Sequence, residues 1–175
     1  MKGSRTALAA TAALAATAFV IPSLHAASSK GSATAHPAPP GELAQFGHIR
    51  SLTRSGARYV LRFDPAFWLG GTTATRAAVE DGAIGPGEPV PNDYYIRDES
   101  RRALTYLVPA RARATVLVQG RAGIRSQRVP IAELAQIVKG RNPQRRRLSD
   151  RGSHLGYWAR IQLDTVRVLD QQYQP

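Results

Sequence analysis

Polar and apolar residues alternate along two neighbouring stretches of the chain, residues 48–54 and residues 59–63. A period of two is typical of a strand that buries one face. Ser55 and Gly56 separate the two stretches and form a common turn pair, so the pattern predicts a β-hairpin. Pro65 should end the second strand, because proline has no N–H to donate to a sheet.

Three further stretches have the composition of strands. Residues 94–97, 104–108 and 114–118 are rich in β-branched or aromatic residues. Residues 84–91 hold three prolines and two glycines, so they predict a loop before the first of these strands. The polar residues 98–102 are expected to form a turn that joins the first strand to the second.

The last apolar pattern, residues 157–169, changes side part of the way along. Alternation holds as far as Leu163, after which Val166 and Val168 point inward instead. A slip of one residue reverses the two faces of a strand, so this change predicts a bulge or bend near Asp164. We therefore expect one long bent strand, which would close a small barrel.

Two segments have the pattern of short helices. Thr72 or Thr73 is expected to cap the first helix, and Gly82 to end it. Its apolar side consists of Ala74, Ala77 and Ala78. The second helix follows Pro130 and ends at Gly140. Its apolar face consists of Ile131, Leu134, Ile137 and Val138.

Five or six strands with two short helices favour one fold class over the others. The pattern predicts a mainly β or α+β fold, namely a small antiparallel β-barrel of the OB (oligonucleotide- and oligosaccharide-binding) type.

The N-terminus has the pattern of a secretory signal peptide, residues 1–26. Lys2 and Arg5 give a positive start, and the apolar stretch Ala7–Ile21 is shorter than the roughly 20 residues that span a bilayer. Cleavage is expected after Ala26, which predicts a secreted, extracellular protein. An uncleaved signal anchor is the alternative, whereas a lipid-modified cysteine anchor is excluded because the chain has no cysteine.

The rest of the chain divides into a linker and one domain. Residues 27–42 are small, polar and proline-rich and predict a disordered linker. Residues 43–175 are expected to form a single β-rich domain. Without cysteine, this domain has neither a disulfide nor a thiolate metal site, and its core alone must stabilise it.

Charge is strong and unevenly distributed. The chain carries a formal net charge of +12, with acidic residues dominant in 64–99 and arginines dominant in 100–160. Such asymmetry is typical of a protein with an anionic partner. The alternative is compositional, because a GC-rich genome favours arginine and alanine without any ligand.

The basic segment after the second helix is the first candidate site. On a barrel surface, its side chains could contact a polyanion such as a cell-envelope polymer, or an acidic protein. Export disfavours nucleic acid as the partner. The alternative is a solvated basic loop. The candidate residues are Lys139, Arg141, Arg145, Arg146, Arg147 and Arg151, extended by arginines that include Arg111.

A carboxylate and amide group is the second candidate site. Its oxygens could bind a hard cation or a polar ligand, or serve a small extracellular enzyme. The alternative is structural, because Asp before Pro often ends a strand and Asn-Asp often forms a turn. The candidate residues are Asp64, Asn92, Asp93, Tyr94 and Tyr95.

Most recognisable catalytic chemistries have no pattern in this chain. Beyond the signal peptide the histidines are His36, His48 and His154, and no Gly-x-Ser-x-Gly elbow accompanies them. The loop around Gly85 and Gly87 lacks the lysine of a phosphate-binding loop. No catalytic residue and no cofactor is therefore expected, and the sequence leaves open whether a metal binds.

Four short motifs carry a resemblance to a known group of proteins. They are FDPA at 63–66, EDG at 80–82, PNDYYI at 91–96 and QYQP at 172–175. As a set, over most of 46–175, they resemble uncharacterised secreted proteins and lipoproteins of Gram-positive bacteria, including actinobacteria and bacilli. The resemblance implies an exported domain with no assigned activity.

These observations favour a secreted, non-enzymatic domain that binds an anionic envelope or extracellular partner through arginine. A small extracellular enzyme or cation-dependent site is one alternative. Nucleic-acid binding by an OB-like barrel is the other.

Overall fold

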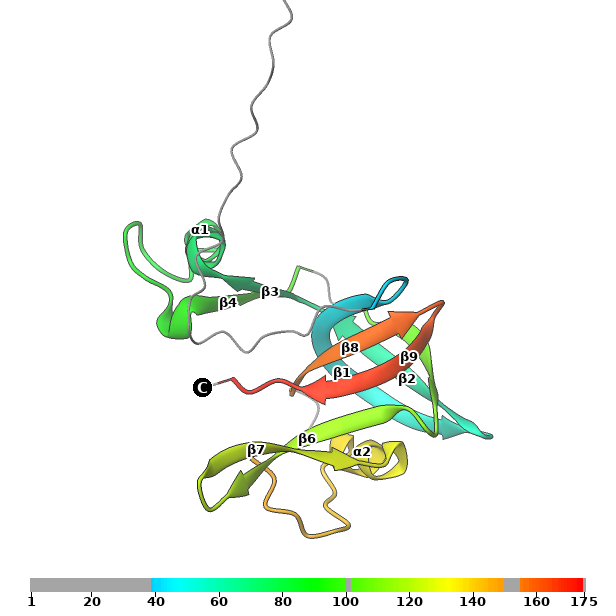
Figure 1. Ribbon diagram of the computed structural model, residues 1–175. Helices are drawn as coiled ribbons and strands as arrows, with labels where there is room; N and C mark the ends of the chain where they lie inside the picture. Colours follow the sequence, from blue (N-terminus) through cyan, green and yellow to red (C-terminus); the bar gives the residue numbers. More distant parts are fainter. Residues whose placement is uncertain (1–38, 100–101, 150–154, 175) are drawn as a thin grey trace, which may run out of the picture. The chain divides into compact units, whose positions relative to one another are not determined.

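Five strands close into a barrel (Figure 1). The computed structural model describes residues 39–99, 102–149 and 155–174, all within one unit of the chain, Ala35–Pro175. The strands pair in the order β1-β2-β5-β9-β8 and return to β1. Their bounds are β1 Leu43–Ser55, β2 Arg58–Pro65, β5 Leu104–Pro109, β8 Gly156–Gln162 and β9 Thr165–Gln171. The predicted mainly β, OB-like barrel with two short helices is thus confirmed.

The barrel is mixed in strand direction. Most neighbouring strands are antiparallel, but β9 runs parallel to β5 and also to β6 (Arg113–Gly120). β6 continues into β7 (Gly123–Val129), which lies at the edge of the sheet. β7 was not predicted, because nearly all its side chains are exposed and its sequence has no apolar alternation.

The predicted first hairpin is confirmed. Residues of β1 and β2 pair from Ser55 with Arg58 back to Gly47 with Pro65. Gly56 has a φ of 59°, which is the left-handed conformation that glycine adopts without a Cβ penalty.

The prediction of one long bent strand near the C-terminus was wrong, because the segment forms a second hairpin. β8 ends at Gln162, the chain reverses through Leu163 and Asp164, and β9 starts at Thr165. Both turn residues have positive φ, 45° and 58°, as a two-residue hairpin turn requires. The apolar pattern changes side because of this reversal. Leu-Asp is not the Asn-Gly type of pair that predicts such a turn.

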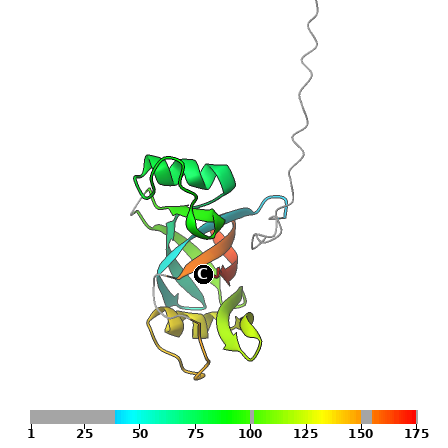
Figure 2. The same cartoon turned by 90° about the vertical axis from the view of Figure 1, so that its left-hand side faces the viewer.

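The small second sheet consists of β3 (Phe67–Gly70) and β4 (Tyr94–Arg97). Helix α1 (Gly71–Glu80) lies along this sheet (Figure 2), and the 3-10 turn η1 (Pro91–Asp93) leads into β4. The buried face of α1 is the predicted alanine face. The predicted threonine cap was wrong, because α1 begins after Gly70 with no side-chain cap.

β4 and β5 do not form a hairpin, because they belong to different sheets. Residues 100 and 101 of the expected turn lie outside the described residues. The small sheet contacts the barrel through aromatic rings, and Ala66, which links β2 to β3, makes a backbone hydrogen bond to β1. The rings of Phe46 and Trp68 lie 5.1 Å apart, edge to face, and the Ala66 N–H donates to the Phe46 carbonyl at 2.9 Å.

Helix α2 (Ile131–Val138) completes the barrel core. Its predicted apolar face is buried against β1 and β6. Burial of these large side chains removes apolar surface from water and is the main stabilising term of the fold. The largest fully buried side chains are those of Tyr157, Phe46, Phe63, Ile49, Leu52, Leu61, Ile131, Leu134, Ile137 and Leu169.

Replacement of Gly47 by alanine should strongly destabilise the barrel. A Cβ there would lie 2.2 Å from the Asp64 carbonyl oxygen and 2.9 Å from the Pro65 Cα, and backbone atoms cannot rotate away. We expect the free energy of unfolding to fall by about 3 kcal/mol in urea titrations. Gly70→Ala is the control, because its Cβ would meet nothing closer than 3.9 Å; an equal loss in both variants would contradict the account.

Tyr157→Phe should stabilise the protein. The buried Tyr157 hydroxyl has no hydrogen-bond partner among the described residues, so its removal should raise the free energy of unfolding by about 1 kcal/mol.

The same group should also make stability depend on pH at the alkaline end. Burial raises the pKa of Tyr157, so above about pH 10 the unfolded chain releases a proton that the folded chain keeps. The free energy of unfolding should therefore fall as pH rises, and less steeply in Tyr157→Phe. Urea titrations between about pH 8 and pH 11 would measure how the free energy of unfolding changes with pH in both proteins. Equal slopes would count against the assignment.

Candidate functional site

Asp64, the first predicted ligand-binding residue, is fully buried at the end of β2. Its Oδ2 accepts a hydrogen bond from Arg50 Nε at 2.8 Å, and the two side chains form an ion pair. Its Oδ1 has no partner within the described part of the chain. Arg50 stands where the register of the β1–β2 ladder shifts, so the pair fixes the hairpin at its irregular point.

The other four residues of that candidate group lie in η1 and in β4 of the small sheet. Asn92 and Asp93 lie in η1, both at positive φ. The Tyr94 ring stacks on Trp68 at 4.2 Å with an interplanar angle of 10°. The Tyr95 hydroxyl donates to an Asp81 carboxylate oxygen at 3.1 Å.

The tyrosines of this group are built into the small sheet rather than aimed at a shared site. Burial raises the pKa of both Tyr94 and Tyr95, and the hydrogen bond to Asp81 adds to the rise at Tyr95. Asp64 lies in β2 of the barrel and is paired with Arg50. Across the described residues no group of three or more acidic or histidine side chains could hold a metal ion.

The basic loop is only partly available for a ligand. Arg146 Nη2 donates to Glu133 Oε2 of α2 at 2.9 Å, and this hydrogen bond raises the pKa of Arg146. Arg141 donates to Gln136 at 3.2 Å. Lys139, Arg145 and Arg147 are exposed, and Arg151 lies outside the described residues.

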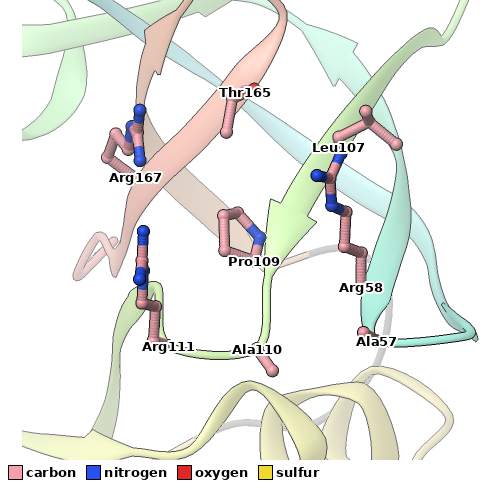
Figure 3. Close-up of a pocket in the computed structure, with 8 residues that line it drawn as sticks. All are labelled: Ala57, Arg58, Leu107, Pro109, Ala110, Arg111, Thr165 and Arg167. Atoms are coloured by element: carbon pink, nitrogen blue, oxygen red, sulfur yellow. The ribbon is translucent and has the colours of Figure 1, made fainter.

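A different set of arginines lines a cavity of about 520 Å³ on the outside of the barrel (Figure 3). The cavity arises where β5 and β9 separate. Leu107 of β5 pairs with Thr165 of β9. The next residue pair between this segment and β9 is Arg113 of β6 with Val168. Between these pairs the chain leaves β9 in a turn and then returns to it. In this turn the Ala112 N–H donates to the Pro109 carbonyl at 2.9 Å.

Three elements each contribute one arginine to this cavity. Arg58 begins β2 and pairs with Pro109 of β5, Arg111 lies in the turn after β5, and Arg167 points outward from β9. Figure 3 shows Arg111 and Arg167 on one side of Pro109 and Arg58 on the other. The remaining lining residues are Ala57, Leu107, Pro109, Ala110 and Thr165.

Within the described part of the chain, no carboxylate neutralises these three guanidinium groups. No carboxylate lines the cavity, and none of the three forms an ion pair or side-chain hydrogen bond with another described residue. Other arginines differ in this respect: Arg97 binds Glu80 and Asp81 at 2.9 and 2.8 Å. Three unpaired guanidinium groups around one cavity create a local positive field and offer planar, bidentate donors for an oxyanion.

Two smaller cavities have a different character. One, of about 240 Å³, lies over α1 and includes Arg97 with its partner Glu80. The other, of about 310 Å³, is lined by neutral side chains from Leu117 to Gln174. The cavity around Arg58, Arg111 and Arg167, named here the arginine cavity, is therefore the candidate site.

Sequence reasoning missed two of the three residues of this site. Arg111 was named among the arginines that extend the basic loop, but Arg58 and Arg167 were not. Alternation along the strands gives the available signal, since it places both arginines on outward positions. Their convergence requires the parallel pairing of β5 with β9, which the pattern does not supply.

The chain matches no family model, no curated protein and no solved structure. The resemblance to secreted Gram-positive proteins therefore stays a prediction, and we infer function from the arginine cavity alone.

Arg146→Gln should lower stability, which would identify Arg146 as structural. The change leaves Glu133, only 8% exposed, without its cation, so we expect a loss of about 2 kcal/mol in the free energy of unfolding by urea titration. Arg145→Gln and Arg147→Gln should change it by less than about 0.5 kcal/mol, because these exposed arginines have no such partner among the described residues. Equal losses in all three variants would contradict this assignment.

Proposed function

We propose that this protein binds an anionic ligand, without catalysis, in the arginine cavity. The observation that carries the proposal is the convergence of Arg58, Arg111 and Arg167 on a cavity that no carboxylate lines. Like charges gathered without counter-charges repel one another, and a bound oxyanion removes that repulsion.

The lining favours binding over chemistry. Its hydrogen-bonding side chains are the three arginines and Thr165, and its other residues are Ala, Leu and Pro. Such a surface can hold phosphate, sulfate or carboxylate groups by charge and by N–H donors. The predicted signal peptide, residues 1–26, supports the further proposal that the ligand is met outside the cell membrane.

Removal of the three cavity charges should weaken anion binding much more than removal of three other charges. We expect Arg58→Gln/Arg111→Gln/Arg167→Gln to raise the Kd for inorganic polyphosphate about 10- to 100-fold, since each exposed charged contact contributes about 0.5–1 kcal/mol. Titration calorimetry at fixed salt would measure it.

The matched control is Arg121→Gln/Arg145→Gln/Arg147→Gln, which lowers the net charge equally at exposed positions outside the cavity. Its Kd should rise by less than about threefold. If the control loses as much affinity as the cavity variant, binding follows net charge and the proposal fails. If the control alone loses affinity, the basic loop is the site instead.

Salt gives an independent test of the same contacts. With three charged contacts, log K should fall against log salt concentration with a slope of about −2 to −3, and the cavity variant should lose most of this slope. A slope unchanged by the cavity substitutions would overturn the assignment.

A further inference from the structure

Leu163 is unusual for a surface residue in both its exposure and its backbone conformation. It stands in the β8–β9 turn and is 93% exposed, the highest value among the exposed large hydrophobic residues that the structure describes. Its φ is 45°, a left-handed conformation that a large side chain adopts rarely and that Asn or Gly would adopt easily. Departures from local rules without a packing reason mark functional positions.

The turn that carries Leu163 adjoins the arginine cavity. The Leu163 carbonyl accepts a hydrogen bond from the Thr165 hydroxyl at 3.4 Å, and Thr165 lines the cavity. The next carbonyl along, that of Asp164, accepts from the Leu107 N–H at 3.0 Å. Leu107 also lines the cavity and is 39% exposed, so two exposed leucines lie at one end of it.

The arginines lie farther along the same strands. Arg167 follows Thr165 by two residues on β9, and Arg58 pairs with Pro109, two residues beyond Leu107 on β5. Two residues of strand span about 7 Å. The surface therefore passes from an apolar tip to a cationic cavity over a distance comparable with the depth of a bilayer interface, about 5–10 Å.

The acidic residue of the turn does not enter the cavity. Asp164 is not among the lining residues, and its charge adds, after burial, to the raised pKa of Tyr106. Tyr106 packs against the barrel core. The cationic character of the cavity is thus retained beside the leucines.

We infer that this surface docks on an anionic lipid bilayer, with Leu163 inserted into the interface and the arginine cavity holding lipid phosphate groups. The inference rests on the proposed function and names its ligand. Arginine at headgroup level together with an apolar tip below it combines the two terms of interfacial binding, charge attraction and apolar burial. Among the described residues, no helix is long and apolar enough to cross a membrane.

Leu163→Asn removes the apolar burial at the bilayer and leaves the charge attraction of the arginines unchanged. Asparagine suits the positive φ of the turn, so the melting temperature should stay equal or rise. Sedimentation with vesicles of phosphatidylcholine and phosphatidylglycerol should show at least a roughly tenfold weaker affinity, because the apolar contact is lost. Polyphosphate binding should be unchanged, since Leu163 does not line the cavity.

Ile124→Asn is the matched control, because Ile124 is 37% exposed on β7 and outside the cavity. It should sediment with anionic vesicles as the original protein does. Vesicles of phosphatidylcholine alone should retain little of either protein, because they offer the arginines no net charge.

Leu163→Trp tests insertion directly. Its added fluorescence should shift to shorter wavelength with anionic vesicles and be quenched by lipids brominated on the acyl chain. If polyphosphate binds but neither vesicle binding nor quenching is seen, the bilayer inference is wrong while the anion site stands. If Arg58→Gln/Arg111→Gln/Arg167→Gln leaves polyphosphate binding intact, the proposed function itself fails.

Discussion

Closure of the barrel depends on the parallel pairing of β5 with β9, whereas the other neighbouring strands of the barrel are antiparallel. In the described chain this pairing amounts to one rung, Leu107 with Thr165, supported by the Leu107 N–H donating to the Asp164 carbonyl at 3.0 Å. Beyond the rung, β5 follows β2 while β9 continues alongside β6. The Leu107–Thr165 rung closes the barrel, and the separation of β5 from β9 beside it opens the arginine cavity. The fold and the candidate site therefore share one origin.

Local patterns were sufficient for much of the fold. Alternation with Gly56 between two strands predicted the first hairpin, and the apolar spacing after Pro130 predicted α2, because each signal is complete within a few residues. The patterns failed where local preference is weak or overridden. The exposed strand β7 has no buried face to reveal it, and the turn at Leu163 uses residues that rarely form one.

The candidate site was harder to predict because it is assembled from distant parts of the chain. A run of neighbouring arginines is visible in the sequence, but Arg146 of that run is committed to Glu133. Arg58, Arg111 and Arg167 are scattered, and only strand pairing brings them to one cavity. Asp64 and the Asn92–Tyr95 segment looked similar as polar groups, yet the first belongs to the barrel and the second to η1 and β4.

Two of the cavity arginines, Arg58 and Arg167, stand on outward strand positions. Their neighbours Tyr59, Val166 and Val168 are buried in the barrel. Side chains at outward positions contribute little to the core, so they can be exchanged with small cost in folding free energy. Inward and outward residues of each strand are therefore under different structural constraints. Alternate residues are constrained by packing, while those between them can change without disturbing the core.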